Sequence, residues 1–325
     1  PRPADTSCEA GAGVSCPNIN GVTGLALLSA YDRGNDPAVL ADAVAAGQLL
    51  TSIHNAHPAD RPFSQDLEFL VALSAASGDP QYATLATSWF ATITTQFPNP
   101  ADRADAIFTG RNAQGLRTLA VWDIASSIRA AKAAGSISYA GGLANRVIAR
   151  EADWKDLIVA HRWDQCGVSG GCGPAGNKFA FDYTLLGMGS MLWAMHDLPG
   201  FDAKISEYRS WLLSQQDASG SWDVGDLQIT AYVALGLGAV GGTGTAAAIQ
   251  KAVEFFIANQ LPNHGWPSYV DATGTGAEFT NVNSEVARAI AMLDGTQPGQ
   301  FVQVTPAQLA TVTFSDVLTA GTTTV

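Results

Sequence analysis

Two kinds of helical segment alternate along the chain, and this alternation constrains the fold more than any other feature. Apolar residues recur at three- and four-residue spacing in segments that Gly, Pro and Asn clusters separate. Segments of the first kind are apolar on every face and cover residues 20–33, 63–77, 113–134, 178–197, 226–240 and 280–294. Segments of the second kind have one polar face and cover residues 37–54, 80–96, 140–161, 202–216 and 244–260. A helix that is apolar all round is buried, whereas a helix with a polar face is peripheral.

This alternation predicts a ring of helical hairpins with an inner and an outer layer. The spacing between the starts of successive apolar segments fits one helical hairpin with its loops. We therefore predict an all-α fold, an α/α toroid of about six helical hairpins over residues 20–295, with an open solenoid as the competing arrangement. Because an outer helix returns the chain each time, the inner helices should run parallel and begin at one rim of the ring.

The two ends of the chain differ from this helical region. Residues 1–19 form a short N-terminal segment with two cysteines, for which we expect extended structure. Residues 296–325 are rich in Gln, Thr and Val, and β-branched residues favour strands or extended structure. We expect this C-terminal tail either to pack across the ring or to serve self-association with a partner chain.

Cysteine usage predicts an exported protein. The four cysteines form two local pairs, which are Cys8 with Cys16 and Cys166 with Cys172. Of the three possible connectivities we favour these two local disulfides, and neither spacing suits a zinc site, so no metal is expected. We interpret the beginning Pro1-Arg2-Pro3 as a mature end left by signal removal. The expected location is secreted, periplasmic or on the cell surface.

The charge balance argues against several classes of partner. The chain has 29 acidic and 17 basic residues, a net charge of −12 and a pI near 4.6. The basic residues form no stripe with which to neutralise phosphates, so neither nucleic acid nor an anionic membrane surface is an expected partner. The sequence contains no phosphate loop, dinucleotide fingerprint or Gly-x-Ser-x-Gly elbow, and we predict no cofactor.

The clearest internal repeat lies in the C-terminal third. A Gln and a Trp recur with a period of 44 residues, as Gln216 and Trp222 and again as Gln260 and Trp266. A Gly lies between the two residues in each unit, as Gly220 and as Gly265, which is shifted by one position. We expect the Gln amide to bond the end of the following helix. The Trp should cover the glycine turn and donate its indole N–H to a backbone carbonyl. Each unit would then tie one hairpin to the next.

This spacing resembles the Gln-Trp repeats of the terpenoid cyclase and protein prenyltransferase superfamily, whose members form α/α toroids. The resemblance covers about residues 203–294 and implies the ring architecture. The sequence has neither the Asp-rich motif of the cyclases nor a visible Asp, Cys and His zinc trio of the prenyltransferases. The joint Ser77-Gly78-Asp79-Pro80-Gln81-Tyr82 is similar to hairpin joints of six-hairpin glycoside hydrolases and polysaccharide lyases. This second resemblance implies a carbohydrate-active ring.

Polar residues gather near the starts of the apolar helices, which the parallel arrangement would bring to one rim. The acid/base candidates lie within or beside apolar helices, where an unpaired carboxylate is costly, and they are Asp66, Glu68, Asp182, Tyr183, Asp226 and Glu285. The candidates for ligand binding are Asn112, Trp122, Trp222, Trp266 and Tyr269. The alternative interpretation for each Asn and Asp is an ordinary helix cap.

Three functions follow from these patterns. The first is a carbohydrate-active enzyme or a binder of another small ligand at the polar rim. The second is a non-catalytic extracellular subunit that assembles through its terminal segments. The third is a terpene-cyclase-like enzyme, which needs a deep aromatic cavity and an acid.

Overall fold

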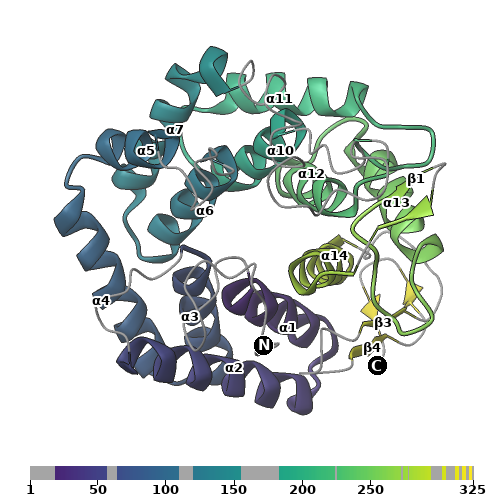
Figure 1. The fold of residues 1–325 in the computed structure, drawn as a ribbon, viewed down its shortest axis with the longest axis horizontal. Coiled ribbons are helices and arrows are strands. Elements are labelled where there is room, and N and C mark those ends of the chain that lie inside the picture. The colour runs from purple at the N-terminus through teal and green to yellow at the C-terminus, as the bar shows by residue number, and fades with distance from the viewer. Residues whose placement is uncertain are drawn as a thin grey trace.

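The computed structural model describes residues 19–56, 64–109, 120–154, 183–223, 225–271, 274–276 and 278–293, together with four short strands between 302 and 323. Within these residues, six helices form the inner layer of a ring (Figure 1): α1 (Asn20–Gly34), α3 (Ser64–Ser77), α6 (Ala120–Ala133), α10 (Tyr183–Met195), α12 (Leu227–Val240) and α14 (Thr280–Leu293). Each contacts the next, and α14 packs against α1. The fold is therefore a closed α/α toroid, as predicted, and the open solenoid is wrong.

The outer layer returns the chain between successive inner helices. It contains α2 (Pro37–Ala56), α4 (Pro80–Gln96), α7 (Ile137–Ala149), α11 (Asp202–Ser214) and α13 (Thr245–Ala258). Asp79 and Pro80 fix the start of α4, because the Asp79 side chain accepts a hydrogen bond from the backbone N–H of Gln81 at 3.0 Å and Pro80 occupies the first helical position. None of the helices in the described part of the chain combines the length and the apolar character that a bilayer crossing requires.

An additional outer helix, α5 (Pro100–Thr109), was not predicted from the sequence. It packs against α7 and α6. Its apolar face consists of little more than Ala104, Ile107 and Phe108, all of them buried. A helix this short shows too few apolar repeats to be distinguished from a loop.

The inner helices begin at one rim of the ring, as the alternation predicts. The hydroxyl groups of Thr23 in α1 and Ser284 in α14 are 3.0 Å apart, and each lies near the start of its helix. A side chain added at Gly21, in the first turn of α1, would meet the backbone of Gln65, in the first turn of α3, at 2.5 Å. Equivalent turns of α14, α1 and α3 therefore lie at the same level.

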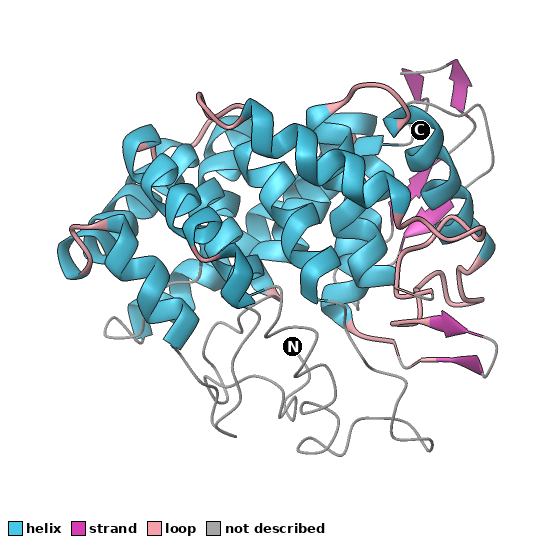
Figure 2. Cartoon of the chain, turned by 90° about the horizontal axis from the view of Figure 1, so that it is seen from above, coloured by secondary structure: helices cyan, strands magenta, loops and turns pink. Residues whose placement is uncertain are grey.

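The described strands form three local antiparallel hairpins beside the helical ring (Figure 2). The first joins β1 (Val270–Asp271) to β2 (Gly274–Thr275), between α13 and α14. In the C-terminal tail, β3 (Val302–Val304) pairs with β4 (Val312–Phe314) and β5 (Val317–Thr319) pairs with β6 (Thr322–Thr323). The expectation of extended structure in the tail is confirmed for these strands. The N-terminal segment lies outside the described residues.

Candidate functional site

The two tryptophans of the Gln-Trp repeat belong to the frame of the ring. Trp222 and Trp266 are fully buried. The indole N–H of Trp222 donates to the carbonyl of Leu212, and that of Trp266 donates to the carbonyl of Phe256, both at 2.8 Å and both ten residues back along the chain. The predicted bond to a backbone carbonyl is therefore present in both units. Because both rings are enclosed and both N–H groups are bonded, these side chains offer no surface to a ligand.

Gln216, the first glutamine of the repeat, also joins hairpins, although not by the predicted bond. The Gln216 amide donates to the carbonyl of Gly220 at 2.9 Å and to that of Ala248 in α13 at 2.8 Å. The bond was expected at the end of the following helix, α12, and instead reaches the next outer helix. Gly220 has φ +94° and lies against α13, where a side chain would come within 2.3 Å of the Lys251 carbonyl. The turn approaches α13 this closely because residue 220 is a glycine.

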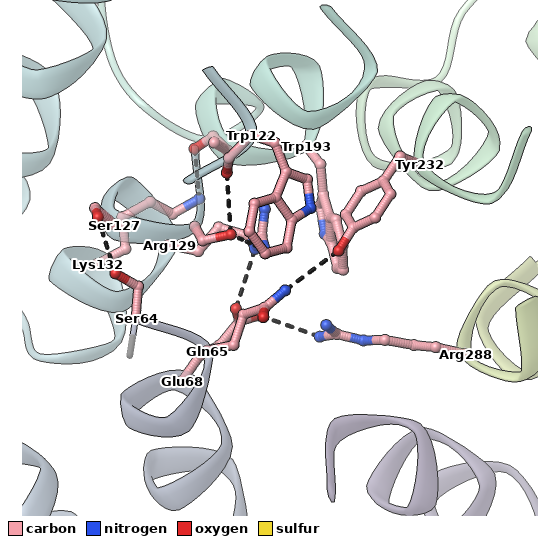
Figure 3. A network of polar contacts seen from close by, with 12 residues as sticks. Ser64, Gln65, Glu68, Trp122, Ser127, Arg129, Lys132, Trp193, Tyr232 and Arg288 are labelled. Carbon is pink, nitrogen blue, oxygen red and sulfur yellow. Dashed lines mark hydrogen bonds and ion pairs between the residues drawn. The ribbon is translucent and has the colours of Figure 1, made fainter. Parts of the chain in front are cut away.

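The centre of the ring holds a group of polar and aromatic side chains that we call the axial cluster (Figure 3). The members labelled in Figure 3 are Gln65 and Glu68 from α3, Trp122 and Arg129 from α6, Trp193 from α10, Tyr232 from α12 and Arg288 from α14. Glu285 from α14 belongs to the cluster as well, because it lies close to Tyr232 and to Gln228 from α12. The Gln65 amide donates to the Tyr232 hydroxyl at 3.2 Å. Because α3 and α12 lie on opposite sides of the ring, this bond crosses its axis. Polar groups, rather than a purely apolar plug, therefore occupy this level of the ring.

Glu68 holds two arginines in the axial cluster. Its carboxylate accepts from Nε of Arg129 at 3.0 Å and from Nη2 of Arg288 at 3.1 Å. The guanidinium carbons of these arginines lie 4.2 and 4.3 Å from the centroid of the Trp193 ring. Burial opposes ionisation of Glu68, but the two cations outweigh it and lower the pKa of the carboxyl below its ordinary value. This ion triad carries two positive charges and one negative charge.

Glu285 is the second carboxyl group of the cluster and its surroundings are different. Glu285 is only 2% exposed, and neither of its carboxyl oxygens has a hydrogen-bond partner in the described part of the chain. Burial raises the pKa of Glu285 to about 8, although the nearby Tyr232 hydroxyl and Gln228 amide act in the opposite direction. Glu285 is therefore mostly protonated at neutral pH.

Three buried N–H groups of the cluster also lack a hydrogen-bond partner among the described residues. They are the indole N–H of Trp122, Nη1 of Arg129 and Nε of Arg288. Buried polar groups in native proteins nearly always have a partner, so each exception needs an explanation such as water or a ligand. The side chains of Glu68 and Arg288 retain 14% and 11% exposure, so the cluster is not sealed from solvent.

Of the candidates chosen from the sequence, Glu68, Trp122 and Glu285 come together in the axial cluster. Asp66 is buried in the first turn of α3. Asp226 caps α12 by accepting from the backbone N–H of Ile229 at 2.7 Å, which is the alternative that the sequence left open for it.

The described part of the chain places the remaining candidates only in part. Tyr269 is buried and its backbone forms a bridge with Asp226. Tyr183 is the first residue of α10. The residues that lie outside the described part of the chain are Asp182, Asn112, Cys8, Cys16, Cys166 and Cys172.

Sequence reasoning missed the two arginines, Trp193 and Tyr232. Arg129 is 5% exposed and Arg288 lies among buried residues of α14, and a buried charge needs a partner. The argument that selected Glu68 and Glu285 therefore applies equally to basic residues, and it would have identified both. Trp193 and Tyr232 had no such signal, because aromatic residues are ordinary in a buried helix.

The described residues contain no group of three or more His, Cys, Asp or Glu side chains arranged to hold a metal ion. No family model matches the chain, and no curated protein matches it.

Two solved structures are similar in chain course. One, from Klebsiella pneumoniae subsp. pneumoniae MGH 78578, is described as a possible member of the GH105 family. It has a TM-score of 0.49 and 16% identity, over 84% of this chain and 80% of that chain. The other, from Salmonella enterica subsp. enterica serovar Paratyphi A str. ATCC 9150, has the same description. It has a TM-score of 0.46 and 15% identity, with the same coverage.

Proposed function

We propose that the axial cluster binds a small ligand of the carbohydrate class and that Glu285 is its proton donor. The observation that carries this proposal is Glu285 itself, a buried carboxyl group at the centre of a closed ring, without a hydrogen-bond partner among the described residues. An unpaired polar group in such a place is destabilising for the protein alone. Retaining it is understandable if a ligand supplies the partner.

The composition of the cluster suits a sugar. Sugar hydroxyl groups both donate and accept hydrogen bonds, and a site for them needs both kinds of group. The unpartnered N–H groups of Trp122, Arg129 and Arg288 are donors, and the carboxyl group of Glu285 offers an acceptor and a proton. Trp122 is only partly buried, and its ring offers an apolar face to sugar C–H groups.

A protonated carboxyl group near neutral pH is suited to general acid catalysis on a glycosidic oxygen. Glycoside hydrolysis usually needs a second carboxylate. Both Glu68 oxygens are bonded to arginines, so Glu68 is a poor choice for that role. Asp226 is the better candidate, because its negative charge adds to burial in raising the pKa of Glu285; one of its oxygens also accepts the cap hydrogen bond from Ile229.

The same cluster argues against the terpene-cyclase alternative. Carbocation intermediates need an environment without positive charge. Arg129 and Arg288 place two guanidinium groups beside Trp193, and in a buried site they would repel a carbocation strongly.

The proposal is tested by calorimetric titration of the full chain with a panel of neutral and acidic mono- and oligosaccharides, with product analysis by chromatography. We expect saturable binding of at least one sugar, and loss of that binding in Trp122→Ala. Glu285→Gln should retain binding and reduce any turnover by roughly 10²- to 10⁴-fold. The control is Glu254→Gln, at an exposed position of α13, which should behave as the unmodified chain. Absence of binding across the panel, with the fold intact by circular dichroism, would refute the proposal.

The second candidate function is assembly through the C-terminal tail. Its strands β3 to β6 pair only within two-stranded hairpins in the described structure, and none of these strands contains a charged residue. Such strands are available for pairing with another chain. If the tail mediates self-association, removal of residues 297–325 should convert an oligomer into a monomer, as measured by light scattering. A full-length chain that is already monomeric at high concentration rules this function out.

A further inference from the structure

We infer that Arg129, Glu68 and Arg288 form an oxyanion subsite of the axial cluster, which binds a carboxylate, sulfate or phosphate group carried by the ligand. The inference rests on the proposed binding function, because it specifies the chemistry of the ligand at that same site. It depends on three observations: the charge of the triad, its unpartnered donors and its fixed geometry.

The charge of the triad favours an anion. Two guanidinium groups share one carboxylate, and the neighbouring Glu285 is mostly protonated at neutral pH. One positive charge at the ring axis is therefore left uncompensated by these groups. The excess is opposite in sign to the chain as a whole, whose net charge is −12. Burying an uncompensated charge is strongly unfavourable, and a bound anion removes this penalty.

The donors that an oxyanion needs are present on the same two residues. Nη1 of Arg129 and Nε of Arg288 are buried and have no hydrogen-bond partner among the described residues. They come from α6 and α14, and their guanidinium groups meet at Glu68. A neutral hydroxyl group would satisfy such a donor and leave the charge uncompensated. An oxyanion satisfies both requirements through charge-assisted hydrogen bonds.

Trp193 holds the subsite in shape. Both guanidinium groups lie over its ring, at 4.2 and 4.3 Å from the centroid, and the indole itself is nearly fully buried. Cation–π contact of this kind restricts the orientation of both arginines before a ligand arrives. Preorganised donors gain affinity because less side-chain freedom is lost on binding.

The test uses inorganic oxyanions and therefore does not depend on the identity of the sugar. Sulfate, phosphate and acetate are titrated separately into the full chain at constant ionic strength, and binding is measured by calorimetry and by the shift in melting temperature. We expect saturable binding, with the preferred anion indicating which group the ligand carries. Glu68→Gln removes the internal competitor and should tighten binding by roughly tenfold or more. Arg288→Gln should weaken binding by at least a similar factor.

The matched control is Lys251→Gln, which removes one positive charge from an exposed position of α13 and should leave anion affinity unchanged. If Arg288→Gln fails to fold, Glu68→Gln still decides the test, because a folding defect cannot produce the gain in anion affinity that is expected of it. Equal anion affinity in the unmodified chain and in Glu68→Gln would overturn the subsite, and so would a response that does not saturate.

The outcomes separate this inference from the proposed function. If neutral sugars bind the axial cluster while no oxyanion binds, the subsite is wrong and the carbohydrate site stands. If oxyanions bind with the expected variant pattern and no sugar binds, the subsite stands and the carbohydrate proposal fails.

Discussion

Glu285 should make the stability of this protein depend on pH in a way that one substitution removes. Its ordinary pKa is 4.5, and burial raises the pKa in the folded protein to about 8. Between these values the unfolded chain loses the proton while the folded chain keeps it, so stability falls as pH rises. Each pH unit in this window is worth about 1.4 kcal/mol, which gives a loss on the order of 4–5 kcal/mol by pH 8. Below pH 4.5 both states are protonated and the effect vanishes.

Glu285→Gln keeps the shape of the side chain and has no proton to lose. The measurement is urea unfolding of both proteins at intervals from pH 4.5 to pH 9, taking the difference in free energy of unfolding at each pH. Other titrating groups cancel in this difference. We expect the variant to gain stability relative to the unmodified chain progressively from pH 5 to pH 8 and to level off above that. A difference that stays constant from pH 5 to pH 9 would refute the reasoning, because Glu285 would then titrate alike in both states.

Two further predictions concern the frame of the ring, and both are measured by urea unfolding. Trp222→Phe removes the indole N–H that bonds the Leu212 carbonyl and should cost about 1–3 kcal/mol; an unchanged midpoint would show that the bond adds nothing. Gly236→Ala would place a methyl group 2.3 Å from the Gly189 carbonyl, where α12 and α10 touch, and should destabilise by roughly 1–3 kcal/mol or more. The matched control is Gly141→Ala in α7, where the added methyl group meets open space and should stabilise the protein by about 0.5–1 kcal/mol. Equal effects of the two substitutions on the free energy of unfolding would contradict close packing of the inner helices.

The course of the chain could be predicted from the sequence because its signals are local. The apolar periodicity located the inner helices, and the starts of α1, α3, α12 and α14 fall within one residue of the expected positions. Asp79 and Pro80 marked the beginning of α4 through cap chemistry that involves only neighbouring residues. The indole hydrogen bonds of Trp222 and Trp266 reach back only ten residues, so they could be predicted from the local repeat as well. The helix α5 was missed because ten residues hold too little of the pattern.

Membership of the axial cluster was decided by tertiary structure. Glu68 meets Arg129 across 61 residues of sequence and Arg288 across 220, distances over which no periodicity gives a signal. An inner helix that is apolar on all sides also does not reveal which of its faces turns toward the axis. Glu68 and Glu285 could be selected from the sequence because a buried carboxylate is costly anywhere. Their protonation states were not predictable in this way. Glu68 is ionised between two arginines and Glu285 keeps its proton because ring closure brings α14 beside α1 and toward α3, which sets the charges around each carboxyl group.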